Sequence, residues 1–274
     1  MSSLKVRESF DKSQSSEELP YAPARHVESL DDCYFYHTMD IPNVGTVEGE
    51  WDLRGGADEY LGNVELDGKR VLEVGTASGF LAFHMEQKGA DVVGYDLNEN
   101  FDWDIVPYSR LDLDAIMAKR KKHIRKLNNG WWFTHNALKS NANVVYGSVY
   151  DMPDSIGPVD VCTFGSILLH LQNPFRALQE ALRFTRETVV VTDIPMDIKF
   201  DVTDNFGVPS MFLPNHRRRE PYDTWWILPP ELVQRYVGIL GFEYSEVTYH
   251  RQTYQGKDCH LYTLVARRTT PFEG

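Results

Sequence analysis

From residue 66 onward, short apolar runs alternate with longer stretches in which apolar positions recur every three or four residues. A short apolar run between turn residues is typical of a buried strand, and the longer spacing is typical of a helix that buries one face. The five strand-like runs span residues 70–73, 91–95, 143–146, 159–164 and 188–192. This alternation predicts a parallel sheet flanked by helices.

Two further runs near the C-terminus, residues 244–250 and 260–266, predict an antiparallel hairpin at one edge of the sheet. The expected fold is therefore α/β and Rossmann-like, with a doubly wound, mostly parallel, seven-stranded sheet, an antiparallel edge hairpin and helices on both faces. We expect residues 66–268 to form this domain, and residues 1–65 to form an N-terminal tail and lid segment.

Two segments are long for connections in such a domain, residues 97–142 and residues 195–229, and both are rich in aromatic side chains. The first is longer than one connecting helix requires. Long loops in compact domains are commonly lids or sites, and ligands of open α/β sheets bind outside the carboxyl ends of the strands. We expect these insertions to form a substrate pocket, with Trp51, His135 and Trp225 binding the substrate. The alternative is a dimer interface or additional core.

The first strand runs directly into a glycine-bearing turn, Glu73-Val-Gly75-Thr-Ala-Ser-Gly79, and an apolar helix follows. A strand, a tight glycine turn and a helix form a nucleotide-binding corner. Gly75 lets the chain turn sharply, and Gly79 is expected to let a ligand approach the backbone. A dinucleotide fingerprint requires a glycine at the position of Ala77, so the pattern disfavours NAD.

Acidic residues end the first two predicted strands. Glu73 would repel a pyrophosphate but would attract an amino group. Asp96 follows the first glycine by about 20 residues, a spacing that suits a ribose diol. S-adenosylmethionine combines a ribose with a cationic amino-acid tail and has no phosphate. The two acids therefore favour S-adenosylmethionine as the cofactor.

These motifs resemble those of the class I S-adenosylmethionine-dependent methyltransferases. The family's E-x-G-x-x-x-G pattern matches residues 73–79, and its ribose-binding acid matches Asp96. Its adenine-contact segment matches residues 147–153, with Ser148 where the family usually has an acid, and a fourth element matches residues 159–174. The resemblance implies these cofactor-binding residues: Glu73, Gly75, Thr76, Ala77, Ser78, Gly79, Asp96, Leu97, Ser148, Val149, Gly165 and Ser166.

A narrower resemblance concerns Trp51, residues 68–71 and the segment from His170 to Pro174, which look like the tRNA wobble-uridine carboxymethyltransferase group. The net charge of −12 argues against a broad nucleic-acid surface, because binding phosphates requires a basic footprint. Two basic runs, residues 119–122 and 217–219, are exceptions. On a helix the first run is typical of a solvated face, whereas the second lies in a proline-rich loop and could face a ligand.

The remaining composition indicates an ordinary cytoplasmic protein without a membrane span. No apolar run is long enough to cross a bilayer, and the first 20 residues are polar and lack the apolar core of a signal peptide. The three cysteines are odd in number and widely spaced, which fits a reducing compartment. No motif for a metal site is present.

His170 is the first candidate for a general base, because it follows the fourth parallel strand, where the methyl group should point, and histidine titrates near neutrality. The alternative is a structural histidine that caps the helix beginning at Pro174. His37, His135 and Asp193 are weaker candidates. The sequence favours a methyltransferase acting on an oxygen or nitrogen of a small metabolite. The alternatives are a tRNA wobble-uridine modifying enzyme and a non-catalytic cofactor-binding protein.

Overall fold

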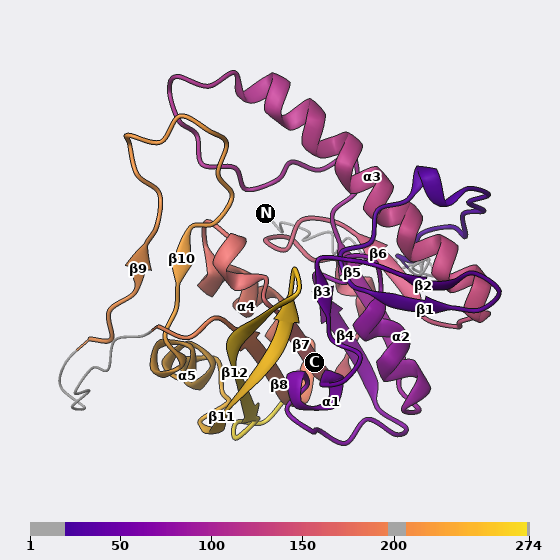
Figure 1. The fold of residues 1–274 in the computed structure, drawn as a ribbon. Helices are drawn as coiled ribbons and strands as arrows, with labels where there is room; N and C mark the ends of the chain where they lie inside the picture. The colour runs from indigo at the N-terminus through magenta and orange to yellow at the C-terminus, as the bar shows by residue number, and fades with distance from the viewer. Residues whose placement is uncertain (1–19, 197–206, 273–274) are drawn as a thin grey trace, which may run out of the picture.

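The computed structural model describes residues 20–196 and 207–272. Its main sheet has eight strands in the order β3-β11-β12-β8-β7-β4-β5-β6 (Figure 1). The five parallel strands are β4 (Arg70–Val74), β5 (Asp91–Asp96), β6 (Asn143–Tyr146), β7 (Val159–Gly165) and β8 (Thr185–Asp193). The antiparallel hairpin consists of β11 (Tyr244–Tyr254) and β12 (Lys257–Arg267). The predicted fold class is confirmed.

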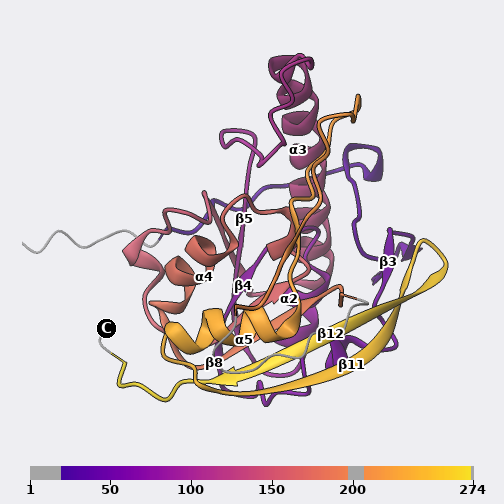
Figure 2. The same ribbon diagram turned by 90° about the vertical axis from the view of Figure 1, so that its left-hand side faces the viewer.

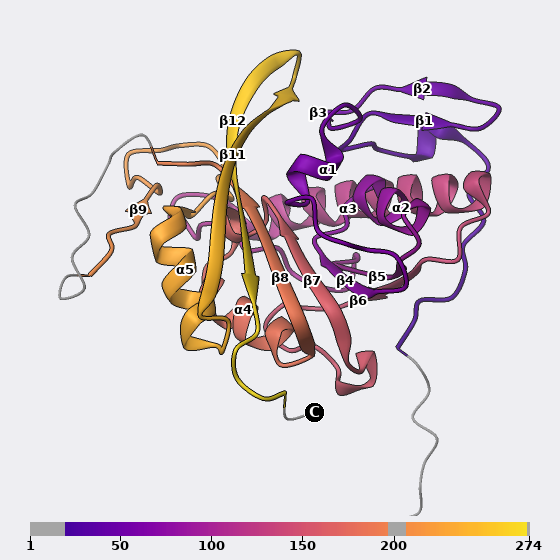
Figure 3. The ribbon, with the colours of Figure 1, turned by 90° about the horizontal axis from the view of Figure 1, so that it is seen from below.

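The eighth strand was not predicted. It is β3 (Trp51–Asp52), which pairs with the last two residues of β11 and so replaces the hairpin at the edge of the sheet. The hairpin can reach β3 because its strands are longer than β8. Tyr262 of β12 already pairs with Asp193, the last residue of β8, so residues 257–261 continue beyond the carboxyl edge of the parallel strands. Figure 3 shows the hairpin curving past the ends of β7 and β8 toward β3.

Helices cover both faces of the sheet (Figure 2). One face carries α2 (Phe80–Gln87) and α3 (Leu113–Leu138), and the other carries α4 (Pro174–Leu182) and α5 (Pro230–Ile239). Each face has its own apolar core, and the sheet separates the two. The short helical elements are η1 (Leu30–Asp32), α1 (Ala57–Tyr60), η2 (Asp154–Ile156) and η3 (Leu168–His170).

Capping residues explain where two of the long helices begin. The Asp112 side chain accepts a hydrogen bond from the Ala115 N–H at 3.0 Å and starts α3. The Asn173 side chain accepts one from the Arg176 N–H at 3.1 Å, and Pro174 occupies the first turn of α4. The segment at residues 97–142 contains a loop followed by α3, a single helix of 26 residues. The helix continues because apolar residues on one side, such as Trp131, remain buried.

The described part of the N-terminal segment packs on the α2 and α3 face. It contains the small hairpin of β1 (Met39–Ile41) and β2 (Gly45–Val47), followed by β3 and α1. Leu53, Ala57 and Leu61 from this segment are buried in the same core as α2. A lid role for the segment stays a prediction, and the expected polar tail at residues 1–19 lies outside the described residues. The insertion at residues 195–229 contains the small hairpin of β9 (Met211–Phe212) and β10 (Trp226–Ile227).

If this N-terminal segment is part of the cooperative fold, truncating its buried anchor should destabilise the whole protein. Leu53 is 0% exposed, so Leu53→Ala should lower the free energy of unfolding by about 2–5 kcal/mol through the cavity it leaves. Val44→Ala, at a side chain that is 41% exposed in the same segment, should change it by less than about 0.5 kcal/mol. Urea unfolding of both variants provides the measurement. Equal, small effects would mean that the segment is a separable lid.

Candidate functional site

The glycine turn after β4 has the tight geometry that the sequence predicted. Gly75 has a φ of +84° and Gly79 a φ of +90°, both in the left-handed region that favours glycine. The structure adds a second reason for glycine at position 79. A Cβ at Gly79 would lie 2.6 Å from carbon atoms of both Phe83 and Trp131, so close packing by α2 and α3 excludes a side chain there. Gly79 therefore serves the packing of the corner, and the approach of a ligand to its backbone stays a prediction.

Two carboxyl groups lie beside this turn. The Thr76 hydroxyl donates a hydrogen bond to Glu73 Oε2 at 2.6 Å. Asp96 accepts hydrogen bonds on both oxygens, from the Ala77 N–H at 2.8 Å and from the Leu97 N–H at 2.7 Å. Burial, with a smaller contribution from the Asp96 charge, raises the pKa of Glu73 to about 7, and burial raises the pKa of Asp96 to about 6. The structure therefore brings both predicted acids to one corner.

The segment after β6 closes this corner from the side. The Gly147 N–H donates to the Asp96 carbonyl at 2.9 Å, which places Ser148 and Val149 next to the end of β5. The Ser148 hydroxyl accepts the Tyr150 N–H at 3.3 Å, and its carbonyl accepts the Tyr95 hydroxyl at 2.9 Å. The Ser148 hydroxyl thus has a partner within its own loop, and its carbonyl has one on β5.

The end of β7 supplies the last predicted cofactor-binding residues. A Cβ at Gly165 would lie 3.1 Å from the ring of Tyr60, and the Tyr60 hydroxyl donates to Ser166 Oγ at 3.0 Å. Ser166 itself has a φ of +50° and donates its N–H to the Thr192 carbonyl at 2.7 Å. Tyr60 is 4% exposed and belongs to α1, in the segment that was expected to be a tail and lid. It is a site residue that the sequence analysis missed.

His170 is the last residue of η3, and it does not cap the following helix. The cap of α4 is Asn173. Instead, Nδ1 of His170 lies 2.9 Å from the main-chain carbonyl oxygen of Asp223, a residue of the second insertion. Because a carbonyl can only accept a hydrogen bond, Nδ1 carries the hydrogen in the neutral ring. Nε2 then has a lone pair, and no described residue forms a hydrogen bond with it.

The two insertions meet over His170. Asp104, in the loop before α3, accepts the Gln172 N–H at 2.7 Å and contacts the Tyr150 hydroxyl. Trp225 joins the same loop to η3, because its indole N–H donates to the Asp104 carbonyl at 2.9 Å and its main-chain N–H donates to the Leu169 carbonyl at 2.7 Å. The insertions therefore form one connected structure at the carboxyl edge of the sheet.

The three residues that were predicted to bind the substrate lie in different parts of the structure. Trp51 is 6% exposed in β3 and donates its indole N–H to the Tyr36 hydroxyl at 3.2 Å. Tyr36 reaches the glycine turn, since its N–H donates to Ser78 Oγ at 3.2 Å. Trp225 is also 6% exposed and joins the insertions as described. Both lie near the candidate site, and their contact with a substrate stays a prediction.

The structure does not bring His135 to this site. Its ring stacks on Trp131, and its Nε2 faces the carbonyl oxygen of Ala142 at 3.1 Å, just before the start of β6. Parallel strands place all their amino ends at one edge, so His135 lies toward the edge opposite the glycine turn. The sequence analysis placed it in a substrate pocket because the continuous helix α3 was not foreseen.

The other two weaker candidates for a general base, His37 and Asp193, are both buried and incompletely paired. His37 is 7% exposed, and its Nδ1 has no hydrogen-bond partner among the described residues. Burial lowers the pKa of His37 to about 4. Asp193 is 2% exposed at the end of β8, and its Oδ2 likewise lacks a described partner. Burial raises the pKa of Asp193 to about 7, while the N–H groups of Ile194 and Leu169 lower it.

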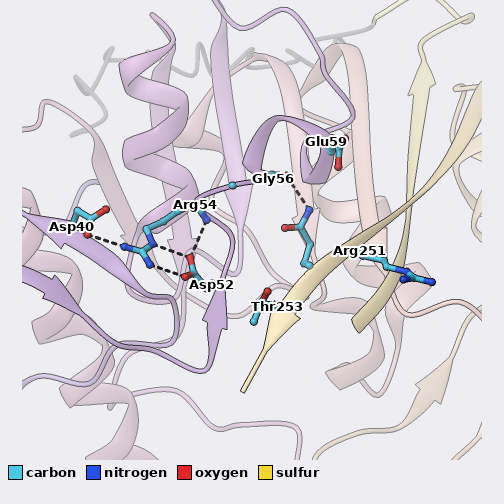
Figure 4. A pocket seen from close by; sticks show the side chains of 9 residues that line it. Asp40, Asp52, Arg54, Gly56, Glu59, Arg251 and Thr253 are labelled. Atoms are coloured by element: carbon cyan, nitrogen blue, oxygen red, sulfur yellow. Dashed lines mark hydrogen bonds and ion pairs between the residues drawn. The ribbon is translucent and has the colours of Figure 1, made fainter. Parts of the chain in front are cut away.

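A separate polar hollow of about 620 Å³ lies at the outer edge of the sheet, between the N-terminal segment and β11 (Figure 4). Its lining includes Gly56, Glu59 and Gln252, and Arg54 is held there by Asp52 at 2.7 Å and Asp40 at 2.9 Å. None of the predicted site residues lines it. Over residues 20–196 and 207–272, no group of three or more His, Cys, Asp or Glu side chains is arranged to hold a metal ion. No helix in the same part of the chain combines the length and apolar content needed to cross a membrane.

Comparisons with known proteins place this geometry in a known fold. No protein-family model matches the chain, and no curated protein matches it either. Among solved structures, the N-terminal domain of EvdMO1, determined with S-adenosylhomocysteine and D-fucose, matches with a TM-score of 0.54 at 17% identity. That match covers 87% of this chain and 92% of the other. The chain has the Rossmann-like methyltransferase fold.

Two further structures resemble the chain at lower TM-scores. One is magnesium protoporphyrin IX methyltransferase from Synechocystis PCC 6803, with a TM-score of 0.46, 13% identity and coverage of 79% of this chain and 82% of that one. The other is 1,6-didemethyltoxoflavin-N1-methyltransferase from Burkholderia thailandensis, with a TM-score of 0.47, 14% identity and coverage of 78% and 77%.

The raised pKa of Glu73 predicts how stability depends on pH. A glutamate in the unfolded chain titrates near 4.3, whereas Glu73 titrates near 7 in the folded protein. Between these values the folded state retains a proton that the unfolded chain has released, so the free energy of unfolding falls as the pH rises from about 4 to about 7. Glu73→Gln removes the titrating carboxyl group. Over that pH range, the free energy of unfolding of the wild type should fall by on the order of 2–3 kcal/mol relative to that of the variant. Denaturant unfolding at a series of pH values tests this. Parallel curves for the two proteins would contradict the assignment.

Proposed function

We propose that the protein is an S-adenosylmethionine-dependent methyltransferase that acts on an oxygen or nitrogen atom of a small metabolite. The observation that carries the proposal is the corner formed by Glu73 and Asp96. Two carboxyl groups lie beside one glycine turn at the carboxyl edge of a methyltransferase fold. Glu73 would repel a nucleotide phosphate beside the turn but would attract an ammonium group, and a ribose diol suits Asp96.

The residues of the corner fit this cofactor. Asp96 is already oriented by two N–H groups, and each carboxylate oxygen has further lone-pair capacity for a ribose hydroxyl. Glu73 has no cationic partner among the described residues, so the positive charge of an amino-acid tail would favour its ionised form. The cofactor supplies an activated methyl group, and the chain has to position the acceptor and remove its proton.

His170 is the residue that we assign to proton removal. Its Nε2 holds a lone pair, because Nδ1 donates to the Asp223 carbonyl. In the proposed step a bond forms between the acceptor atom and the methyl carbon while the bond from that carbon to the sulfonium sulfur breaks. The proton of an acceptor hydroxyl or ammonium group passes to Nε2, and S-adenosylhomocysteine is the coproduct.

The first alternative is modification of a tRNA wobble uridine, which would require basic side chains that are free to bind phosphates. In the run at residues 217–219, two of the three arginines have intramolecular contacts. Arg218 lies 3.8 Å above the Tyr222 ring, and Arg219 donates to three main-chain carbonyls of its own loop. These contacts favour the small metabolite. The second alternative is a non-catalytic cofactor-binding protein, which would bind S-adenosylmethionine without turnover.

One assay separates these possibilities. The protein is incubated with methyl-labelled S-adenosylmethionine and either a small-molecule fraction of cell extract or purified tRNA. Label in the small-molecule fraction supports the proposal. Label in tRNA, with binding that weakens steeply as salt is added, supports the first alternative. Cofactor binding by calorimetry without transfer to either fraction supports the second.

We expect Asp96→Ala to weaken binding of S-adenosylhomocysteine by about 1–3 kcal/mol, because the ribose hydroxyls lose their acceptor and two main-chain N–H groups lose theirs. Asp96→Asn is the matched control: it keeps one oxygen, so it should weaken binding less. Isothermal titration calorimetry measures both. Unchanged affinity in a folded Asp96→Ala variant would refute the assignment of the ribose to this residue.

We expect His170→Ala to lower turnover by about 10²–10⁴-fold while cofactor affinity stays close to wild type. Because Asn173 caps α4, the melting temperature should change little. His216→Ala, an exposed histidine of the second insertion, is the control. Near-normal turnover in His170→Ala would exclude a general-base role.

A further inference from the structure

An ion pair connects α3 to the residue that contacts His170. Arg120 Nη2 lies 2.5 Å from Asp223 Oδ2, and the two side chains are 30% and 20% exposed. The Arg120 guanidinium also lies over the Trp103 ring, 5.0 Å from its centroid. Arg120 is therefore fixed by a rigid helix, by an aromatic ring and by a carboxylate, which restricts where Asp223 can lie.

The hairpin that carries Asp223 has other attachments. Trp225 donates hydrogen bonds to the carbonyls of Leu169 and Asp104, and the Val106 N–H donates to the Tyr222 carbonyl at 2.9 Å. These contacts would keep the hairpin docked without the ion pair. The ion pair thus acts specifically on residue 223, because it fixes the position of that residue and of its main-chain carbonyl.

That carbonyl sets the tautomer of His170. It lies 2.9 Å from Nδ1 and can only accept a hydrogen bond. A neutral imidazole without such a constraint favours the hydrogen on Nε2, which would leave Nε2 unable to accept a proton. The hydrogen bond that one ring nitrogen donates therefore determines that the other nitrogen has the lone pair and can accept a proton.

We propose that Arg120 and Asp223 are positioning residues, which hold His170 in the tautomer with its hydrogen on Nδ1 and so make Nε2 the proton acceptor. The proposal rests on the proposed function, because it identifies how the assigned base is prepared. Neither residue is assigned a contact with the acceptor. Arg120 acts through the Asp223 side chain, and Asp223 acts through its main-chain carbonyl.

The tautomer can be measured without an acceptor substrate. Protein labelled with ¹⁵N in its histidine rings is examined by NMR above the pH at which the rings are charged, and the His170 signals are identified by their loss in His170→Ala. In the wild type the Nε2 signal should have the shift of an unprotonated nitrogen. In Arg120→Met, which keeps the side-chain bulk but not the charge, the signals should move toward the tautomer with hydrogen on Nε2. Arg125→Met, on the exposed side of the same helix, should leave them unchanged.

Two further variants keep the test decisive. Asp223→Asn removes the charge of the partner while retaining the main-chain carbonyl, and it should reproduce the shift even if Arg120→Met fails to fold. Arg120→Lys retains the charge and should restore part of the wild-type signal. Wild-type His170 signals in both Arg120→Met and Asp223→Asn would overturn the proposal.

Kinetics provide a second readout once an acceptor is known. Arg120→Met should lower kcat by about 10–100-fold, as is typical when a residue that orients a functional group is removed, with little change in KM for the cofactor. A wild-type kcat in this variant would also overturn the proposal. Failure of the proposed function would give a different result, namely no turnover in the wild type. The NMR experiment would still decide which tautomer His170 adopts.

Discussion

The shape of the candidate site depends on the Asp96 carboxylate. It joins the end of β5 to the turn after β4, since one oxygen accepts the Ala77 N–H and the other accepts the Leu97 N–H. Ala77 has a φ of +50°, an uncommon conformation for a residue other than glycine. The two charge-assisted hydrogen bonds offset the strain of this conformation. Hydrogen bonds within the protein thus hold the turn, and a turn held in this way lowers the cost of ordering the corner on binding.

Two other carboxyl groups, those of Glu73 and Asp193, are buried at positions where burial does not stabilise the fold. Glu73 and Asp193 are each 2% exposed, and no described cation pairs with either. Burying an ionised carboxylate without a partner is unfavourable, so both groups retain their protons to a higher pH than usual. A chain gains no stability from such residues. Perturbed carboxyl groups at a strand edge are instead characteristic of functional sites, and a cationic ligand would supply the charge that the protein lacks there.

The parallel strands and the glycine turn could be predicted because both are encoded locally. Each strand is a continuous apolar run, and the turn requires glycine at two fixed positions. Strand β3 could not be predicted, because its two residues carry no pattern and their pairing depends on how far the distant β11 extends. The packing of Gly79 could not be predicted either, because it also depends on a residue distant in the sequence. Trp131, which excludes a side chain at Gly79, follows it by 52 residues.

The surroundings of His170 mark a different limit of prediction. Asn173 directly before Pro174 is a helix-start signal, and it would have excluded the capping role of His170 from sequence alone. The partner that His170 does have could not be found in this way. It is a main-chain carbonyl, which every residue possesses, so the identity of Asp223 carries no information about it. Among the described residues, Arg120 is the ion-pair partner of the side chain at position 223.

The site is covered by two structures that originate in different parts of the chain. The N-terminal segment lies against the glycine turn, where Tyr36 donates its N–H to Ser78 and Tyr60 reaches Ser166. The second insertion instead contacts His170 through Asp223, and it joins the first insertion through Trp225 and Asp104. Under the proposed function, the N-terminal segment lies at the cofactor and the two insertions lie at the acceptor. The corner at Asp96 is held by main-chain groups of the parallel strands and their turns and by the packing of Trp131 on Gly79. The parts of the insertions around Asp104 and Asp223 make none of these contacts and can differ in sequence without altering the corner. A change of acceptor therefore requires changes in the insertions, while the chemistry of the cofactor corner stays the same.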